Sequence, residues 1–327
     1  MVHEQGNPDR TLGVVIPTVG ERPELKRLLL TVLDQTRPVQ AIRIVVDAAD
    51  TTLVDGIVDQ LSHRLHSTDL SVTSTGAKRG QGEYLVETGY GYAVNRGLET
   101  LDTDLVAFLD DDDEIRPAHF SQLEAALDPG NGLGVAYSRV EIVTPEGERR
   151  LFPEGDMPRG KIRTGVLIDR HPVLLPATLI SRPVLDEVAG LDQTLDRLAD
   201  TDMVVRLGLA TGFAAVDDPT YVYYRISRKA VVNERVQVET AQMLHKHQQH
   251  LRRRERLLFW DTQARASLRA GLAEVGRDAG EQAVAALWPH PPRFLVDWYV
   301  RIRGRQTPQF LRRIAKRVMG PKSGKAA

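Results

Sequence analysis

The stretch Leu105-Val106-Ala107-Phe108-Leu109-Asp110-Asp111-Asp112-Asp113 joins an apolar run of strand length to four consecutive carboxylates. Such a run predicts a buried strand, and it places the aspartates just past the strand's carboxyl end, where open α/β sheets bind ligands. Adjacent carboxylates repel one another, so they need either full solvation or a bound cation. Mg²⁺ and Mn²⁺ prefer such oxygen ligands. A solvated acidic loop that caps the next helix is equally compatible with this stretch alone.

The composition is typical of a globular protein: 327 residues, 42% hydrophobic and 27% charged. The absence of cysteine excludes disulfides, thiolate metal sites and a cysteine nucleophile, and it fits a reducing compartment. The N-terminal segment Met1–Arg10 is polar, and no apolar run reaches the ~18 residues that a membrane span requires. We therefore expect a cytoplasmic protein.

The charges are distributed unevenly, although the net charge is −1. Residues 233–327 contain 19 Lys and Arg against 8 Asp and Glu, whereas residues 1–232 contain 24 against 36. This shift predicts an acidic domain over residues 1–232 and a basic, mainly helical region over residues 233–327.

Two β-loop-α units are predicted before the acidic stretch, because each apolar run is followed by apolar residues at helical spacing. Successive units of this kind give parallel strands joined by right-handed crossovers. Thr18 and Asp47 follow the two strands, so we expect both at the sheet edge that carries the aspartates. The predicted elements are strand 12–16, which stops at Pro17, helix 25–33, strand 42–46 and helix 54–61.

A third strand, 70–74, leads into the glycine-rich basic loop Gly76-Ala77-Lys78-Arg79-Gly80-Gln81-Gly82. Loops of this kind often surround phosphate, although this one lacks the P-loop and dinucleotide spacings. Lys78 and Arg79 would reach the crevice beside the aspartates. The other predicted elements are helix 93–101, helix 117–127, strand-like segments 134–138 and 140–143, a hairpin turn at Pro145, a mobile loop over 152–168, strand 171–180 and strand 221–226.

A second acidic site lies at Asp200. Met203, Val204 and Leu207 follow it by three, four and seven residues, which is the spacing of one buried helical face. Asp200 is therefore expected at the amino end of a helix that packing holds in place. An ordinary N-cap is the alternative role for such an aspartate.

In their order and spacing, these motifs resemble inverting glycosyltransferases of family 2 with the GT-A fold. The resemblance implies a Rossmann-like α/β protein with a mostly parallel mixed sheet flanked by helices, extended here by a helical basic C-terminal region. Each motif alone is weak, whereas the ordered set is specific. The matching motifs are Val14-Val15-Ile16-Pro17-Thr18 with Leu25 and Gln35-Thr36, Ile44-Val45-Val46-Asp47, Asn95-Arg96-Gly97, Phe108-Leu109-Asp110-Asp111-Asp112-Asp113 with Pro117, Gly190-Leu191-Asp192, and Asp200-Thr201-Asp202 with Arg206-Leu207.

The resemblance also implies a reaction. A sugar would pass from a nucleotide-diphosphate donor, with UDP-sugars favoured, to an acceptor hydroxyl by a single displacement, with Asp200 as the base. Mn²⁺ or Mg²⁺ at Asp112 and Asp110 would neutralise the diphosphate leaving group, with Asp113 and Asp202 in support. The implied donor-binding residues are Pro17, Thr18, Arg22, Asp47, Lys78, Arg79, Asn95, Asp110 and Asp111.

The chain departs from the family pattern at three positions. Ala199 stands where many relatives carry an acid before the base, Val94 where an arginine often precedes the asparagine, and Ala48 where a second aspartate often follows the second strand. Because Val94 carries no charge, neutralisation of the diphosphate is expected from Lys78, Arg79 or Arg96 instead.

The acceptor could be a glycan, a lipid-linked molecule or another hydroxyl compound, and it would contact the variable segment 152–180 and the tail.

The tail interleaves apolar and basic residues at helical spacing. This pattern fits a helix lying on an anionic membrane at its inner face, and it fits equally a helix packed on the main body or on a partner. No nucleic-acid motif accompanies the charge, so no nucleic-acid partner is expected. His245, His247 and His250 are expected to be solvated. The tail residues are Phe294, Leu295, Trp298, Tyr299, Ile302, Phe310, Leu311, Ile314 and Val318, with Arg301, Arg303, Arg305, Arg312, Arg313, Lys316 and Arg317.

Two other functions fit parts of the pattern. A sugar-phosphate nucleotidyltransferase shares a nucleotide-binding α/β body, but it needs a glycine-rich signature after the first strand, of which residues 17–22 are a poor version. A catalytically silent nucleotide-sugar binder or scaffold would recruit a partner through the basic tail. The intact set of Asp110, Asp112 and Asp200 argues against that scaffold.

Overall fold

The computed structural model describes residues 10–77, 88–225, 234–288 and 293–303. The chain divides into two units, Met1–Ala230 and Val231–Ala327. Two predicted donor-binding residues, Lys78 and Arg79, lie outside the described residues.

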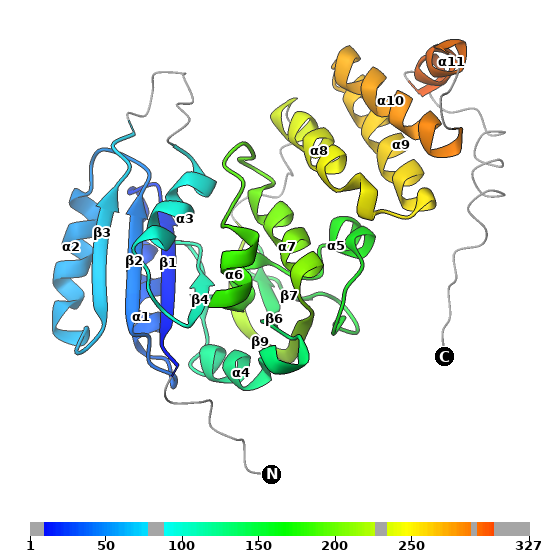
Figure 1. Cartoon of the computed structure of the whole chain (residues 1–327). Helices are drawn as coiled ribbons and strands as arrows, with labels where there is room; N and C mark the ends of the chain where they lie inside the picture. The colour runs from blue at the N-terminus through cyan, green and yellow to red at the C-terminus, as the bar shows by residue number, and fades with distance from the viewer. Residues whose placement is uncertain (1–9, 78–87, 226–233, 289–292, 304–327) are drawn as a thin grey trace. The chain divides into compact units, whose positions relative to one another are not determined.

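The first unit is built on one mixed sheet (Figure 1). Its strands are β1 (Leu12–Thr18), β2 (Ala41–Val46), β3 (Asp69–Ser74), β4 (Leu105–Phe108), β5 (Glu114–Ile115), β6 (Val135–Val143), β7 (Arg149–Phe152), β8 (Thr178–Ser181) and β9 (Phe213–Tyr224). The strand order is β3-β2-β1-β4-β8-β6-β9-β5, with β7 paired to β6. The first four strands of this order pair in parallel, β8 pairs antiparallel with β4 and β6, and β9 runs parallel to β6. This arrangement confirms the predicted fold class.

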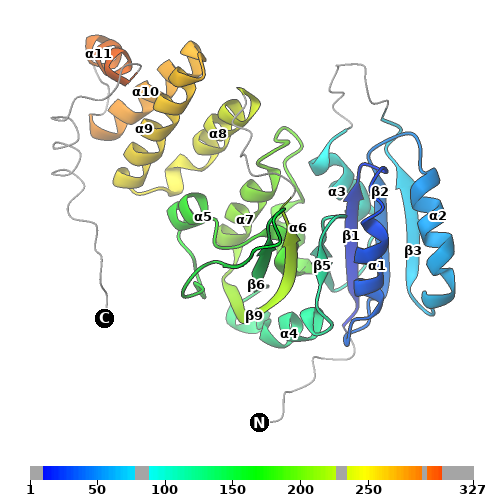
Figure 2. The same cartoon turned by 180° about the vertical axis from the view of Figure 1, so that it is seen from behind.

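Helices cover both faces of this sheet because alternate strand residues point to opposite sides. Val14, Ile16 and Ile44 belong to one core with residues of α1 and α2. On the other face a Cβ at Gly97 would lie 2.5 Å from Val15, so glycine permits α3 to pack closely. Accordingly α3 lies before the sheet in Figure 1 and α1 lies before it in Figure 2. The helices are α1 (Leu25–Leu33), α2 (Thr52–Leu61), α3 (Tyr90–Glu99), α4 (His119–Ala126), α5 (Thr164–Arg170), α6 (Arg182–Val188) and α7 (Ala199–Ala210).

The prediction that the first strand stops at Pro17 was wrong, because β1 continues through Thr18. The Val15 carbonyl accepts from the N–H of Leu109, which follows β4, and the Thr18 carbonyl accepts from the N–H of Asp47, which follows β2. The backbone groups of successive β1 residues therefore point alternately toward β4 and toward β2. Pro17 shares the β4 side with Val15, where pairing has already ended at Phe108. The missing proline N–H therefore removes no ladder bond.

The segment from Phe152 to Ile180 also differs from its prediction. Phe152 belongs to β7, which confirms the hairpin at Pro145, but the rest is not one long loop. Met157 and Ile162 are buried, and α5 begins at Thr164. Only the end of the predicted strand 171–180 is extended, because a 3₁₀ turn over Leu175–Ala177 precedes β8. The segment was predicted to be a loop because most of its residues are polar, but its few apolar residues are buried and hold it in place.

The described part of the second unit is mainly helical, as predicted, with α8 (Glu234–His247), α9 (Arg253–Arg269), α10 (Ala273–Leu287) and α11 (Arg293–Arg303). The histidines of α8 do not lie on a fully exposed helix: His247 is buried, and Nε2 of His245 lies 2.8 Å from Oδ2 of Asp278. In α11, Val296 is buried and the Tyr299 hydroxyl donates to Asp261 of α9. The structure therefore favours packing of α11 within its own unit.

None of the described helices is both long and apolar enough to cross a membrane.

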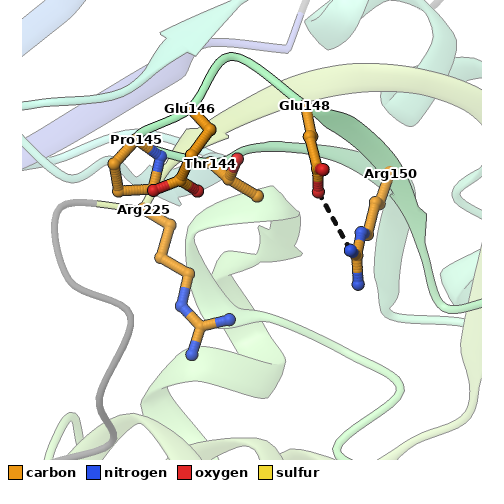
Figure 3. Close-up of a pocket in the computed structure, with 6 residues that line it drawn as sticks. All are labelled: Thr144, Pro145, Glu146, Glu148, Arg150 and Arg225. Atoms are coloured by element: carbon orange, nitrogen blue, oxygen red, sulfur yellow. Dashed lines mark hydrogen bonds and ion pairs between the residues drawn. The ribbon is translucent and has the colours of Figure 1, made fainter.

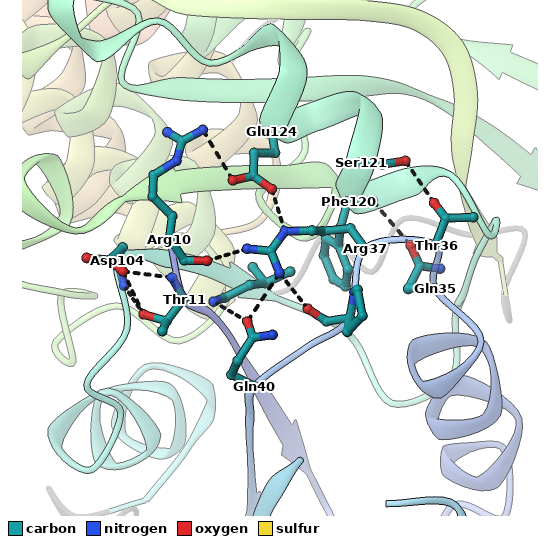
Figure 4. Close-up of polar contacts among 12 residues, drawn as sticks. Arg10, Thr11, Gln35, Thr36, Arg37, Gln40, Asp104, Phe120, Ser121 and Glu124 are labelled. Atoms are coloured by element: carbon teal, nitrogen blue, oxygen red, sulfur yellow. Dashed lines mark hydrogen bonds and ion pairs between the residues drawn. The ribbon is translucent and has the colours of Figure 1, made fainter. Parts of the chain in front are cut away.

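Polar contacts fasten the sheet edge where β1 and β2 begin (Figure 4). The Glu124 carboxylate of α4 accepts from Nε of Arg37 over 2.6 Å and lies 3.2 Å from Nη2 of Arg10. Oε1 of Gln40 accepts from the Leu12 N–H over 2.9 Å. Only 1% of the Glu124 side chain is exposed, so this carboxylate depends on its arginines. The contacts hold α4 against the starts of both strands.

Glu124→Gln should lower the free energy of unfolding by about 3 kcal/mol, because it removes one partner of a buried ion pair. Urea denaturation of the full chain measures this change. Glu99→Gln is the matched control, because Glu99 pairs with Arg96 on an exposed helix surface and should contribute less than about 1 kcal/mol. Equal effects of the two substitutions would contradict the assigned role of Glu124.

Candidate functional site

The acidic cluster, Asp110 to Asp113, forms a tight turn at the carboxyl end of β4. The Asp113 N–H donates to the Asp110 carbonyl over 3.2 Å, and the chain then enters β5. The preceding Leu109 N–H donates to the Val15 carbonyl over 3.1 Å, so β4 is fixed to β1 up to the turn. The four side chains leave this turn toward different neighbours.

Asp111 anchors the turn to the end of β1. Its Oδ2 accepts from the Thr18 hydroxyl over 2.5 Å, and its Oδ1 accepts from Nη1 of Arg22 over 2.9 Å. Only 5% of Asp111 is exposed. The predicted residues Thr18, Arg22 and Asp111 are therefore brought together, but by contacts with one another.

Asp113 anchors the turn to β9. Its carboxylate accepts from the Tyr221 hydroxyl over 2.7 Å and from the Tyr224 N–H over 2.9 Å. Burial raises the pKa of Asp113 to about 7, although both hydrogen bonds oppose this shift. The supporting role predicted for Asp113 has a structural basis in these contacts, and sequence reasoning missed both tyrosines.

Asp112 lies nearer to solvent, with 14% of its side chain exposed. Its Oδ2 is 2.5 Å from Nη1 of Arg22, and its carbonyl accepts from Nη2 of Arg27 over 2.6 Å. Burial raises the pKa of Asp112 and the charge of Arg22 opposes this rise. Arg27 is itself held by Glu114 at 2.7 Å and lies 4.2 Å above the Tyr224 ring. The Asp112 peptide is thus fixed, while its side chain is more exposed than that of Asp111.

Asp110 differs from the other three aspartates of the cluster in its contacts. Among the described residues its carboxylate has no hydrogen-bond or ion-pair partner. Burial raises its pKa well above the usual value, and the charges of Asp113, Asp112, Asp200 and Asp111 raise it further. A site with this much uncompensated negative charge favours a bound cation.

Asp200 lies at the start of α7, as predicted. Met203, Val204 and Leu207 are buried behind it, which confirms the predicted helical face. Oδ1 of Asp200 accepts from the N–H of Thr201 over 2.7 Å. Burial raises the pKa of Asp200 above the usual value for an aspartate, whereas that hydrogen bond opposes the rise.

Tyr90, the first residue of α3, lies near both acidic sites and was missed by sequence reasoning. Burial raises its pKa well above the usual value, and the charges of Asp110 and Asp200 add to that rise. The phenol therefore stays protonated and can donate a hydrogen bond in this crevice. No local motif marks Tyr90, because its position depends on how α3 packs.

Asp47 joins three elements at the same sheet edge. Its Oδ2 accepts from the Gly89 N–H at the start of α3 over 2.9 Å, and its Oδ1 accepts from the Thr75 hydroxyl beyond β3 over 3.0 Å. Its own N–H donates to the Thr18 carbonyl over 2.7 Å. The ends of β1, β2 and β3 therefore converge as predicted. Contact of Asp47 with a nucleotide stays a prediction.

Asn95 and Asp202 serve contacts within the protein. The Asn95 amide donates to the Leu191 carbonyl over 2.9 Å and accepts from the Leu191 N–H over 2.8 Å. A Cβ at Gly190 would lie 2.6 Å from Oδ1 of Asn95, so this approach requires glycine. Asp202 is buried and pairs with Nε of Arg206 over 2.7 Å. These contacts account for Asn95 and Asp202 without a donor.

The acidic residues fit Mg²⁺ or Mn²⁺ only together with a substrate. Among the residues that the structure describes, no three His, Cys, Asp or Glu side chains form a metal site by themselves. Asp110 and Asp112 nevertheless present carboxylate oxygens, and Asp110 pairs with no cation in the described part of the chain. Such ions are typically held by one or two carboxylates plus the phosphates of a substrate. The donor chemistry of the cluster matches that arrangement.

A separate pocket of about 340 Å³ lies between the β6–β7 turn and the end of β9 (Figure 3). Arg225 follows Tyr224, the residue whose N–H bonds Asp113, so β9 connects this pocket to the acidic cluster. Its mixed charges suit a polar ligand group. The lining residues are Thr144, Pro145, Glu146, Glu148, Arg150 and Arg225.

Comparison with solved structures supports the fold. S. aureus TarS 1–349 in complex with UDP-GlcNAc gives a TM-score of 0.63 at 16% identity, covering 90% of this chain and 88% of that chain. A longer S. aureus TarS structure gives a TM-score of 0.60 at 15% identity, covering 90% of this chain and 55% of that chain. Identities this low show the fold alone.

Comparison of sequences shows the family. No curated protein matches the chain. The model of glycosyl transferase family 2 matches residues 13–188, which is more than half of the chain and includes β1 to β8 with the acidic cluster. The chain therefore belongs to glycosyl transferase family 2 and is a glycosyltransferase.

Proposed function

We propose that the protein transfers a sugar from a nucleotide-diphosphate donor to an acceptor hydroxyl in a metal-dependent, inverting reaction. The observation that carries this proposal is the proximity of the pair Asp110 and Asp112 to Asp200. The first two leave the end of β4 and the third begins α7, yet the charge of Asp200 raises the pKa of Asp110. Family membership supports the class of reaction.

The nucleotide of the donor would lie over the ends of β1 and β2. Thr18 and Asp47 meet there, at the edge where parallel sheets bind ligands. S. aureus TarS, which has the same fold, has been solved with UDP-GlcNAc and with UDP, and this favours a uridine nucleotide for the present chain. Lys78 and Arg79 would supply positive charge to the diphosphate from a loop outside the described residues.

Asp112 and Asp110 would hold Mn²⁺ or Mg²⁺ together with the donor's phosphates. When bound, such an ion supplies the positive charge that stabilises the departing nucleotide diphosphate. The protein's part is to keep the two carboxylates in place. Asp111 and Asp113 do this through their contacts with β1 and β9.

Asp200 would accept the proton of the acceptor hydroxyl as that oxygen attacks the anomeric carbon. The buried face of α7 fixes its position, and its raised pKa makes it a stronger base than an exposed aspartate. One displacement from the side opposite the leaving diphosphate inverts the anomeric carbon. Neutral Tyr90 lies near Asp110 and Asp200, where it can orient a bound hydroxyl group without adding charge.

Membership of a glycosyltransferase family argues against the two alternative functions, the nucleotidyltransferase and the silent scaffold. The acceptor of the proposed reaction is a hydroxyl compound. We infer that it approaches from the side of Asp200, since the base must reach its proton.

Contact of the tail with an anionic membrane remains a prediction. On α11 the exposed side chains include Trp298, at 49%, and Arg301, and the basic residues from Arg305 onward lie outside the described residues. If these groups bind lipid, the full chain should sediment with vesicles containing anionic phosphatidylserine and stay in solution with neutral vesicles. Trp298→Ser should reduce sedimentation. Equal recovery with both kinds of vesicle would contradict the prediction.

Asp112→Asn should abolish sugar transfer and remove the metal dependence of donor binding, because a neutral amide is a poor ligand for Mg²⁺ or Mn²⁺. Donor binding measured by calorimetry with and without Mn²⁺, over a panel of UDP-, GDP- and dTDP-sugars, tests this expectation. Asp186→Asn, on the exposed surface of α6, is the matched control and should behave as the wild type. Metal-dependent binding that survives in Asp112→Asn would refute the metal assignment.

Asp200→Asn should leave donor binding intact and lower kcat by about 10³-fold, because general-base catalysis is lost. The pKa of Asp200 is raised, so the base is ionised above that pKa and protonated below it. In the wild type kcat/KM should therefore fall as pH decreases, beginning at a pH above the usual aspartate value of about 3.9. Near-normal turnover in Asp200→Asn would show that another group is the base.

A further inference from the structure

Arg22 already brings a positive charge into the acidic cluster. Its Nη1 atom lies 2.5 Å from Oδ2 of Asp112 and 2.9 Å from Oδ1 of Asp111. The arginine side chain is 37% exposed, whereas those of Asp111 and Asp112 are 7% and 14% exposed. A side chain from the solvent-facing loop before α1 therefore reaches the more enclosed pair of carboxylates.

The two carboxylates differ in how firmly they are held. The second oxygen of Asp111 accepts from the Thr18 hydroxyl, so Asp111 stays fixed even without Arg22. Among the described residues, Arg22 is the only side chain with an ion pair or hydrogen bond to the Asp112 carboxylate. The Asp112 backbone is held separately, by Arg27. The Asp112 carboxylate can therefore exchange its partner while the turn stays in place.

A divalent ion and Arg22 would compete for the Asp112 carboxylate. Mg²⁺ binds carboxylate oxygens at about 2.1 Å, so an ion on Oδ2 of Asp112 would lie against a guanidinium nitrogen of like charge. Burial alone would lower the pKa of Arg22, but Asp111 and Asp112 outweigh burial and raise it, so the arginine stays charged. The ion and the guanidinium therefore weaken each other's binding to Asp112.

We propose that Arg22 is a built-in counter-ion that competes with the divalent metal for Asp112 until a nucleotide diphosphate gives the guanidinium another partner. This inference rests on the proposed function, since it takes Asp112 to be a metal ligand. Phosphate oxygens are strong partners for a guanidinium group, and Arg22 already lies beside the crevice. Donor binding would draw Arg22 from Asp112, and metal affinity would rise. Donor and metal are thereby coupled, and by linkage the coupling is reciprocal.

The test measures binding of Mn²⁺ alone to the donor-free full chain, by the electron paramagnetic resonance signal of the free ion. Arg22→Gln removes the competing charge, so Mn²⁺ should bind about tenfold more tightly than to the wild type. Arg22→Met, which is also neutral, should show the same increase in Mn²⁺ affinity. This second variant tests whether the increase comes from loss of the charge and not from the glutamine side chain. Mn²⁺ should also raise the thermal unfolding midpoint of both variants more than that of the wild type.

Two controls separate this inference from the proposed function. Arg149→Gln removes an equal charge from an exposed side chain of β7 and should leave Mn²⁺ affinity unchanged. Asp112→Asn should abolish Mn²⁺ binding in the wild type and in Arg22→Gln. If Asp112→Asn abolishes binding but neither Arg22 variant tightens it, Arg22 is not a competitor and the metal site stands. If Mn²⁺ binding is absent throughout, or does not depend on Asp112, both proposals fail.

Discussion

Electrostatic repulsion within the turn Asp110–Asp113 is the constraint on which the rest of the site depends. A carboxylate in a partly buried turn is stable only with a partner, and each partner here comes from a different part of the chain. Asp111 takes Thr18 and Arg22 at the end of β1, and Asp113 takes Tyr221 on β9. The carboxylates whose repulsion would otherwise open the turn therefore connect β1 with β9, two strands that are not neighbours in the sheet. The remaining negative charge is concentrated at Asp110 and Asp112.

A second long-range contact brings the other acidic site to this crevice. Asn95 holds both backbone groups of Leu191, across 96 positions of the sequence, and Gly190 makes room for the amide. Gly97 on the same helix lets α3 approach Val15 of the sheet. One helix therefore packs on the sheet and also fixes the segment that precedes α7. Since Tyr90 begins that helix, its position near Asp110 and Asp200 follows from the same packing.

The elements predicted correctly from the sequence are those that depend on the local pattern of apolar residues. Buried parallel strands are continuous apolar runs, so β1, β2 and β4 and the edge shared by Thr18, Asp47 and the aspartates could be found from the sequence. The extension of β1 through Pro17 could not, because it depends on where pairing with β4 ends. Nor could adjacency in the sequence decide which of four neighbouring aspartates is buried. Asp111 was expected to bind the donor, and in the structure its carboxylate accepts from Thr18 and Arg22. Tyr90 and Tyr221 leave no local signal, since only tertiary packing brings them to the site.

The incomplete neutralisation of the turn is itself informative about function. Asp113 shows that this fold can satisfy a carboxylate in the turn with two hydrogen bonds, and Glu124 shows that it can enclose a carboxylate between two arginines. Among the described residues Asp110 has no such partner, although burial and four neighbouring carboxylates disfavour its charged form. A turn built for stability alone would place an apolar or amide side chain at this position. A carboxylate without a partner in the described part of the chain, beside a second one paired with Arg22, suits a cation that arrives with the substrate.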